Sequence, residues 1–410
     1  MSKTKIYAGL EIGTSKIVCV VGEARPDSTI KILGRGQTPS RGIRRGEIVD
    51  DEMADICVKD AIRRAEETSN IGIDDVLLSI TGAHISSVNH TGRVRIPDDH
   101  NQITDEDLYQ AKEQARQVVI PQNNVTMHSV TRYYTLDGQD KIRNPVGRVA
   151  RTLEAHMHIV HGVRQRIQNH IRFVREMPLR LENLVFAPLA AATIALTREA
   201  KDNGAVLIDI GGGTSDYILY ADGVICATGC VGIAGDHFTS DLAQVLRIPQ
   251  SRAERLKIEK GTCWPEDALP NEPIRLDDNT TPEPRVVEQR FIAEILYARA
   301  REIFEEILMR LDIEGMLDRV AGGIYLTGGM SLMRGIDRVA QEVFQMPVHR
   351  SGSEAVSGVT AVFEDPRYAT AVGIIRYAQI LEREKSEGTK QRGFLDWLKD
   401  FLGNSRFFSF

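Results

Sequence analysis

The first part of the chain shows apolar and polar positions at the spacings of strands and of one helix. Residues 5–50 have short apolar runs separated by turn residues, which predicts a strand meander. Residues 50–68 repeat apolar positions at helical spacing, and residues 76–81 read as a buried strand. The helix side chains predicted to face inward are Met53, Ile56, Cys57, Ala61 and Ala65.

A separate α+β unit is predicted from about residue 84 to 161. Its helix begins at Thr104, and Asp107 three residues later gives the pattern of a capping box. Near its end, a strand places His156 and His158 on the same side as Glu154, which predicts a solvated face and not a metal site. Residues 163–175 then read as a helix that returns the chain to the first domain.

Two turns that follow an acidic residue and isoleucine carry the main candidate chemistry. Residues 11–17 read Glu-Ile-Gly-Thr-Ser-Lys-Ile, and residues 209–217 read Asp-Ile-Gly-Gly-Gly-Thr-Ser-Asp-Tyr. Apolar strands flank each turn, so the glycines are predicted at hairpin tips. Glycines allow several backbone N–H groups to surround an anion. A single glycine-rich turn, however, more often serves only to form a tight hairpin. Neither turn runs into a helix, which disfavours a Walker loop or a Rossmann turn, and the pair predicts two loops closing on one phosphate chain.

Two further segments carry candidate binding residues. Residues 324–326 read as a buried strand and 327–330 as a turn, with Ser331 as the N-cap of a helix to about Val343. Glu254 and Lys257 are three apart on a predicted helix, hence on one face. They could hold a ribose hydroxyl, and the alternative is a solvated ion pair.

These segments together resemble the nucleotide site of the actin, MreB and DnaK-type superfamily, and residues 326–330 and 368–373 join the two turns in that resemblance. Within the superfamily the chain resembles the FtsA family of bacterial cell-division proteins. The segments that carry this are Arg-Gly-Ile-Arg-Arg-Gly-Glu-Ile at 41–48, Ile-Thr-Gly-Ala-His-Ile at 80–85 and Arg-Asn-Pro-Val-Gly at 143–147. The likeness runs through nearly the whole chain.

The resemblance implies an actin-like α/β fold, in which two ribonuclease H-like domains enclose a nucleotide cleft and an α+β subdomain called 1C is inserted in the first. The implied boundaries are 1–84 and 162–200 for subdomain 1A, 85–161 for 1C, 201–228 and 300–381 for 2A, 229–299 for 2B, 382–393 for a linker and 394–410 for a C-terminal tail.

The resemblance also implies ATP and Mg²⁺ as ligands. Glu11 and Asp209 would orient the metal, through water. The residues implied to hold the phosphates are Gly13, Thr14, Ser15, Lys16, Gly211, Gly212, Gly213, Thr214 and Ser215. Those implied around ribose and adenine are Glu254, Lys257, Gly328, Gly329 and Met330.

Two positions depart from the superfamily pattern. Glu11 stands where many relatives have aspartate. Residues 187–191 contain no acid, amide or histidine where chaperone-type ATPases carry glutamate and actins have glutamine nearby. Because nothing there orients an attacking water, we expect tight ATP binding with weak or absent hydrolysis, and we assign no catalytic residue.

In the FtsA family the 2B lobe binds the C-terminal peptide of the tubulin-like protein FtsZ. The side chains here that could meet an acidic peptide are Arg285, Arg290, Arg299 and Arg301, although solvated helix charges are the commoner use of such residues. The resemblance further implies that subdomain 1C serves self-assembly into filaments and contact with later division proteins.

The end of the chain carries an amphipathic pattern after a charged, glycine-containing linker. One stripe consists of Phe394, Leu395, Trp397, Leu398, Phe401 and Leu402, with Asp396, Lys399 and Asp400 opposite. This pattern predicts a helix in the interface of an anionic membrane, and the alternative is a helix docked on its own domain. Together with the family resemblance, it implies peripheral attachment at the cytoplasmic face of the inner membrane, at the division site.

Composition narrows the alternatives. A formal net charge of −6 over 410 residues gives no electrostatic reason to expect nucleic acid. The five cysteines are predicted to be reduced structural thiols, and no apolar run of 18 residues occurs. The competing functions are an MreB-like shape-determining filament and a small-molecule kinase of the same superfamily.

Overall fold

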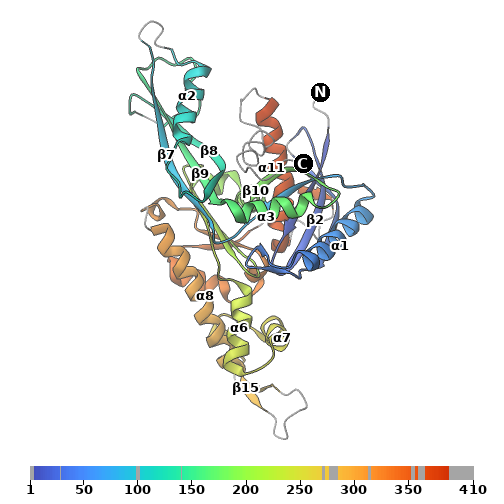
Figure 1. The fold of residues 1–410 in the computed structure, drawn as a ribbon. Coiled ribbons are helices and arrows are strands. Elements are labelled where there is room, and N and C mark those ends of the chain that lie inside the picture. The colour runs from blue at the N-terminus through green and yellow to red at the C-terminus, as the bar shows by residue number, and fades with distance from the viewer. Residues whose placement is uncertain are drawn as a thin grey trace.

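The fold was obtained as a computed structural model that describes residues 4–27, 29–97, 102–139, 141–269, 273–276, 285–312, 315–351, 356–358 and 365–386. Two lobes lie side by side, and an arm of three strands and a helix extends from the first (Figure 1). The arm and the tip of the second lobe form opposite ends of an elongated molecule.

The first lobe is built on a six-stranded sheet in the order β10-β6-β1-β2-β3-β18. Its strands are β1 (Lys5–Ile12), β2 (Lys16–Ala24), β3 (Ile30–Pro39), β6 (Asp75–Ile80), β10 (Arg180–Phe186) and β18 (Val356–Gly358). The first three form the predicted antiparallel meander, and β6 joins β1 in parallel. The helices that pack on this lobe are α1 (Asp51–Ser69), α3 (Arg164–Arg175), α4 (Ala187–Ala195) and α11 (Ala369–Ser386).

The second lobe repeats this strand arrangement. Its sheet has the order β13-β12-β11-β16-β17. The strands are β11 (Ala205–Ile210), β12 (Ser215–Ala221), β13 (Val224–Val231), β16 (Ile324–Thr327) and β17 (Val348–Arg350). Again an antiparallel meander of three strands is extended by parallel strands from its first member, so the two predicted turns occupy equivalent places, between β1 and β2 and between β11 and β12. The helices of this lobe are α5 (Arg198–Asp202), α6 (Gly235–Leu246), α7 (Gln250–Lys260), α8 (Gln289–Asp312) and α9 (Ile336–Phe344).

The arm is the predicted insert. Its sheet has the order β7-β9-β8, formed by β7 (Ile85–Arg95), β8 (Asn124–Leu136) and β9 (Thr152–Val163), and it carries α2 (Asp105–Arg116). The predicted capping box is confirmed, because Thr104 Oγ1 accepts the N–H of Asp107 at 3.2 Å and Asp107 Oδ2 accepts the N–H of Thr104 at 2.9 Å. The remaining elements are β4 (Ile43–Arg44), β5 (Glu47–Ile48), β14 (Pro273–Arg275), β15 (Val286–Glu288) and 3₁₀ turns at Pro265–Asp267, Leu317–Arg319, Gly329–Leu332 and Pro366–Tyr368.

The chain crosses back to the first lobe earlier than expected. We expected residues 300–381 to belong to one subdomain of the second lobe. Instead β18 pairs with β3, and α11 packs on α4, β1 and β2. The apolar residues of α11 supply part of the first lobe's core, and Ile374 lies against Gly9 of β1. Apolar periodicity alone does not indicate which of two similar sheets a helix covers.

The inward face of α1 was predicted partly wrongly. Met53 is 41 % exposed and Ile56 is 63 % exposed, whereas Cys57, Ala61 and Ala65 are buried as predicted. The helix lies directly on glycines of β3, and a Cβ at Gly36 would fall 1.7 Å from the Ala61 carbonyl oxygen. The contact is so close that small residues face the sheet and larger ones turn outward.

The polar side of β9 was also predicted wrongly. His158 is fully buried, with Nδ1 2.9 Å from Asn89 Oδ1 and Nε2 2.9 Å from Thr228 Oγ1. Thr228 belongs to β13, the edge strand of the second lobe, against which the arm packs. A polar strand face predicts exposure to solvent only when no second sheet covers that face. Here the sheet of the second lobe covers it.

All five cysteines are buried and unpaired. The stripe Phe394, Leu395, Trp397, Leu398, Phe401 and Leu402 lies outside the described residues. In the part of the chain that the structure describes, helices are too short or too polar to cross a membrane.

Candidate functional site

The two predicted turns are hairpin tips that meet between the lobes. Each tip closes on itself, since Gly13 N donates to Lys16 O at 3.1 Å and Gly211 N donates to Thr214 O at 2.9 Å. The tips are in contact with each other: a Cβ at Gly213 would lie 2.4 Å from Thr14 Oγ1. A Cβ at Gly212 would lie 2.9 Å from Ser15 Cβ, so the neighbouring hairpin requires glycine at positions 212 and 213.

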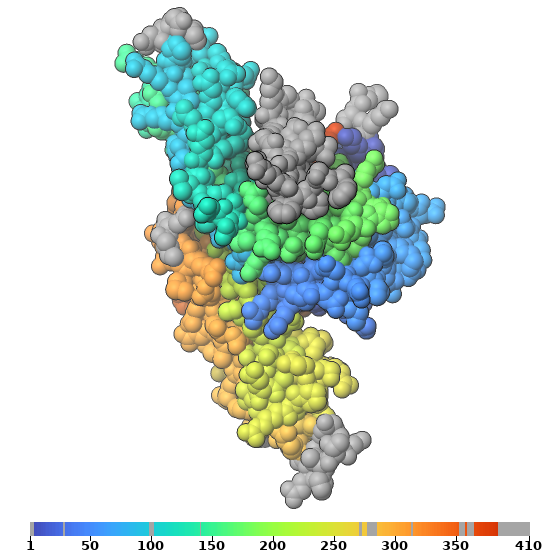
Figure 2. Space-filling view, viewed as in Figure 1, coloured from blue at the N-terminus to red at the C-terminus, as the bar shows by residue number. Residues whose placement is uncertain are grey.

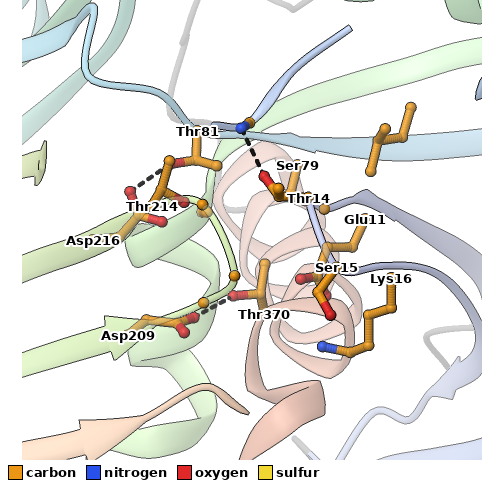
Figure 3. A pocket seen from close by; sticks show the side chains of 17 residues that line it. Glu11, Thr14, Ser15, Lys16, Ser79, Thr81, Asp209, Thr214, Asp216 and Thr370 are labelled. Carbon is orange, nitrogen blue, oxygen red and sulfur yellow. Dashed lines mark hydrogen bonds between the residues drawn. The ribbon is translucent and has the colours of Figure 1, made fainter. Parts of the chain in front are cut away.

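A pocket opens where the tips meet (Figure 3). Glu11, Ser15 and Lys16 lie on one side, and Asp209 and Asp216 face them from the other. Its lining residues are Glu11, Ile12, Gly13, Thr14, Ser15, Lys16, Gly46, Ser79, Thr81, Ala187, Asp209, Gly211, Gly212, Gly213, Thr214, Asp216 and Thr370. A single space is thus surrounded by backbone N–H groups at glycines, three hydroxyls from the two tips and one ammonium group. These are the donors that an anion requires.

Three carboxyl groups line the same pocket, with Asp216 buried and Glu11 and Asp209 half-buried. Burial raises the pKa of Glu11 to about 7, although nearby Lys16 opposes the shift. Burial also raises the pKa of Asp216 to about 7, against the hydrogen bond that the Thr81 hydroxyl donates to it. The pKa of Asp209 is raised by burial as well, while Thr370 Oγ1 donates to its Oδ2 at 2.9 Å. Close, desolvated acids of this kind cluster at functional sites.

The acids fit a hydrated divalent cation. Glu11 Oε2 is buried and has no hydrogen-bond partner, which is costly for a carboxylate unless a cation or water reaches it. No three histidine, cysteine or acidic side chains of the described residues form a direct metal cage. Glu11 and Asp209 therefore suit an ion such as Mg²⁺, which keeps several of its waters.

The raised pKa of Glu11 makes stability depend on pH. Between about pH 4.5, the ordinary value for glutamate, and about pH 7, the folded protein keeps a proton that the unfolded chain has released. Stability therefore falls as the pH rises through this window, by up to about 1.4 kcal/mol per pH unit for this group. Urea unfolding without nucleotide or Mg²⁺ should show a shallower fall for Glu11→Gln than for the unchanged protein.

The control for this experiment is Glu52→Gln, on the exposed side of α1. It should follow the unchanged protein at every pH. Identical pH profiles for Glu11→Gln and the unchanged protein would contradict the buried, proton-binding Glu11 described above.

The predicted residue Ser215 does not face the pocket. Its hydroxyl donates to the Ile233 carbonyl oxygen at 2.6 Å, and the side chain is fully buried. Ser215 is the first residue of β12, and strand alternation directs it to the face opposite that of Thr214 and Asp216. It therefore braces the strand that carries the tip.

Glu254 and Lys257 share one face, as predicted, but they lie behind the pocket. Lys257 Nζ is 2.7 Å from Glu254 Oε2 and donates to Gly235 O at 3.0 Å, and its side chain is only 6 % exposed. The ion pair considered as an alternative is therefore present, but only its Glu254 side, 44 % exposed, is solvated. The pair supports the start of α6, where Gly235 N donates to Gly211 O at 3.1 Å.

Residues 328–330 also lie next to the second tip without lining the pocket. Gly328 has φ +84°, and a Cβ there would fall 2.3 Å from Asp209 Oδ1. Met330 lies against Gly235. The expected helix from Ser331 is wrong: residues 329–332 form a 3₁₀ turn, and α9 begins only at Ile336, after Gly335 in the left-handed region.

Sequence reasoning missed several lining residues. Asp216 and Thr370 lie inside motifs that were recognised, and each accepts or donates a hydrogen bond in the pocket. Gly46 belongs to the 41–48 segment, and its position could not be inferred because no periodicity places a two-residue turn. Thr81 is the last residue of the predicted buried strand and directly follows β6, and a side chain at the end of a parallel strand often reaches a site.

The four arginines proposed for peptide contact all have partners within the protein. Arg299 forms a two-pronged pair with Asp241, with contacts of 2.6 and 2.9 Å. Arg285 donates to the Arg247 carbonyl oxygen at 3.4 Å. Arg290 and Arg301 pair with glutamates one helical turn away, at 3.4 and 2.7 Å, and their side chains are at least half exposed. Arg299 is thus a structural residue, whereas Arg290 and Arg301 stay accessible.

Comparison with known protein families gives independent information on what the chain is similar to. A family model described as cell division protein FtsA matches residues 206–373, and one described as the SHS2 domain inserted in FtsA matches residues 82–161, the arm. Cell division protein FtsA of Pseudomonas aeruginosa is 34 % identical over 91 % of this chain and 89 % of its own length. The FtsA protein of Neisseria meningitidis is 33 % identical over 97 % of each chain.

Solved structures with the same fold are more distant in sequence. The PilM–PilN complex of type IV pilus biogenesis matches with a TM-score of 0.62 at 16 % identity, covering 91 % of this chain and 98 % of that one. MreB5 of Spiroplasma citri bound to AMPPNP matches with a TM-score of 0.55 at 16 % identity, covering 94 % and 100 %. These likenesses confirm the predicted actin-like fold, and the FtsA relatives show that the chain belongs to the FtsA family of cell-division proteins.

Proposed function

We propose that this protein binds ATP with Mg²⁺ between its lobes. The observation that carries the proposal is the meeting of two equivalent hairpin tips at one pocket lined by Lys16 and buried acids. Gly13 to Lys16 and Gly211 to Thr214 would hold the phosphates through backbone N–H groups, hydroxyls and the Lys16 ammonium group. Glu11 and Asp209 would hold the hydrated metal, which supplies positive charge beside the phosphates.

Hydrolysis of the bound ATP is proposed to be weak or absent. Ala187, at the start of α4, lines the pocket and belongs to the segment 187–191, which resembles the one where superfamily ATPases carry a water-orienting side chain. Its methyl group can neither accept a proton nor hold a water. Nucleotide would then act mainly by holding the lobes together, so that the ATP-bound shape persists and assembles.

The role in division is proposed to be that of an adaptor that polymerises on the membrane. The amphipathic stripe from Phe394 to Leu402 would insert into anionic lipid at the cytoplasmic face of the inner membrane. The second lobe would bind the C-terminal peptide of FtsZ, with Arg290 and Arg301 as the accessible cations. The arm would contact neighbouring copies and later division proteins, which would be recruited to the division site.

A reconstitution with vesicles tests this role. FtsZ filaments should sediment with anionic vesicles only when the full-length protein and MgATP are both present. FtsZ lacking its C-terminal peptide is the matched control and should remain in the supernatant. Vesicle binding with no recruitment of FtsZ would support the MreB-like alternative, in which the filament itself is the functional unit.

A further inference from the structure

The hairpin of β4 and β5 belongs to the 41–48 segment and reaches the pocket through Gly46. Arg45 and Gly46 form its two-residue turn, with φ values of +51° and +77°. Gly46 N donates to Thr14 Oγ1 at 2.9 Å, shown by the dashed line that ends on Thr14 in Figure 3. A Cβ at Gly213 would lie 2.8 Å from Arg45 Cα. The turn thus touches both phosphate-loop tips.

Arginine is an unfavourable residue for this turn. Consecutive positive φ values are typical of a type I′ turn, where Asn-Gly and Gly-Gly are preferred because a larger side chain is strained at positive φ. Backbone strain retained beside a pocket is a reason to look for a function of the side chain. Here the strained residue carries a permanent positive charge, and its backbone lies beside Gly213 of the pocket lining.

The hairpin is fixed to the first lobe. Gly46 O accepts a hydrogen bond from the buried His170 Nε2 at 3.0 Å, and Glu47 pairs with Arg166 of α3. The Arg45 side chain nevertheless reaches the second lobe, where its Nη2 lies 3.3 Å from Nε2 of His237 on α6. Figure 2 shows the blue surface of the first lobe against the yellow-green surface of the second along this boundary.

The contact between Arg45 and His237 leaves one donor without an acceptor. Nδ1 of His237 faces the N–H of Ala234 at 3.2 Å, and Nε2 faces Arg45 Nη2 at 3.3 Å. Burial lowers the pKa of His237, and a neutral imidazole accepts at only one of its two nitrogens, so the ring cannot accept from both. Among the described residues, no carboxylate lies within ion-pair distance of Arg45. With Nδ1 accepting from Ala234, the Nε2 hydrogen of the second lobe and the Arg45 guanidinium of the first would both donate to an anion placed between them.

We propose that Arg45 and His237 together bind the terminal phosphate of ATP and thereby distinguish ATP from ADP. The proposal rests on the ATP binding proposed above and adds the lobe-bridging contact. Arg45 and His237 lie next to the pocket through Gly46, Gly213 and the start of α6, whose Asp236 N donates to Gly212 O at 2.7 Å. Guanidinium groups bind phosphate oxygens through paired, charge-assisted hydrogen bonds. ADP lacks the group that both donors would share.

The test uses Arg45→Asn in the full-length protein. This change creates Asn-Gly, the sequence that the turn prefers, so folding should be retained and the melting temperature should not fall. Affinity for MgATP should drop at least about tenfold, the loss of one charge-assisted hydrogen bond, while affinity for MgADP should change less than about twofold. Arg41→Asn, an equal charge change at an exposed position of the same segment, should alter neither affinity.

Three results would overturn the proposal. Equal losses for ATP and ADP would make Arg45 a structural link between the lobes, and unchanged affinities would leave it without a nucleotide contact. If Arg45→Asn abolishes binding of inorganic phosphate to the ADP-bound protein but leaves ATP affinity intact, the site takes released phosphate instead. If the unchanged protein binds neither nucleotide, the proposed ATP binding is rejected as well. That outcome is distinguishable from the other three, in which the unchanged protein binds nucleotide.

Discussion

Replacing Gly213 with alanine should lower nucleotide affinity by about a hundredfold or more. A Cβ at this position would lie 2.4 Å from Thr14 Oγ1 and 2.9 Å from the Arg45 backbone nitrogen, so it would meet both the first tip and the β4–β5 turn. Backbone cannot move away as a flexible side chain can, and the tips would separate. Displacing several phosphate donors by even an ångström removes much of their binding energy. Titration calorimetry with MgATP measures the effect.

Gly72→Ala is the matched control for this substitution. A Cβ there meets nothing within 4 Å, and the backbone does not need positive φ. Its affinity should equal that of the unchanged protein. If Gly213→Ala also binds normally, the contact between the two tips is not what forms the binding site, and the proposed grip on the phosphates is wrong.

Replacing Trp397 and Leu398 with glutamate should abolish sedimentation with anionic vesicles. The stripe formed by Phe394 to Leu402 carries acids on its opposite face, so attachment must rest mainly on apolar burial. At about 25 cal/mol per Å² of apolar area, burying one large side chain contributes about 1.5–3 kcal/mol. Losing two such side chains and adding two charges should reduce vesicle binding by more than a hundredfold.

Asp396→Asn with Asp400→Asn is the control for the tail. It changes the polar face by two charges and leaves the apolar stripe intact, so vesicle binding should stay the same or increase. Binding should also strengthen when ATP promotes assembly, because linked tails bind at high effective concentration. Unchanged sedimentation of the Trp397 and Leu398 variant would favour the alternative in which this helix docks on its own domain.

The hairpin tips and the insert could be predicted from the sequence because their signals are local. Each signal involves only residues close together in the chain. These signals are the glycines between apolar strands, the capping box at Thr104 and the acidic residue before each turn. Glu11 and Asp209 could be placed for the same reason. Both end up in the pocket, with Lys16 beside them.

The parts that could not be predicted depend on contacts between distant segments. His158 is polar on a strand, and only the packing of the arm on β13 buries it. The helix α11 belongs to the first lobe because its apolar side chains fit β1 and β2, which no periodicity specifies. Ser215 lies in a recognised motif but turns away from the pocket, since one position along a strand reverses the face. The candidate role of Arg45 depends on its contact with His237 of the other lobe, which the sequence does not indicate.

The most direct measurement is calorimetric titration of the full-length protein with MgATP, repeated with Lys16→Ala. We predict one binding site per chain for the unchanged protein and loss of that site when the ammonium group between the tips is removed. Absence of measurable binding, or binding that Lys16→Ala leaves unchanged, would contradict the claim that the two lobes hold one nucleotide between their equivalent hairpin tips.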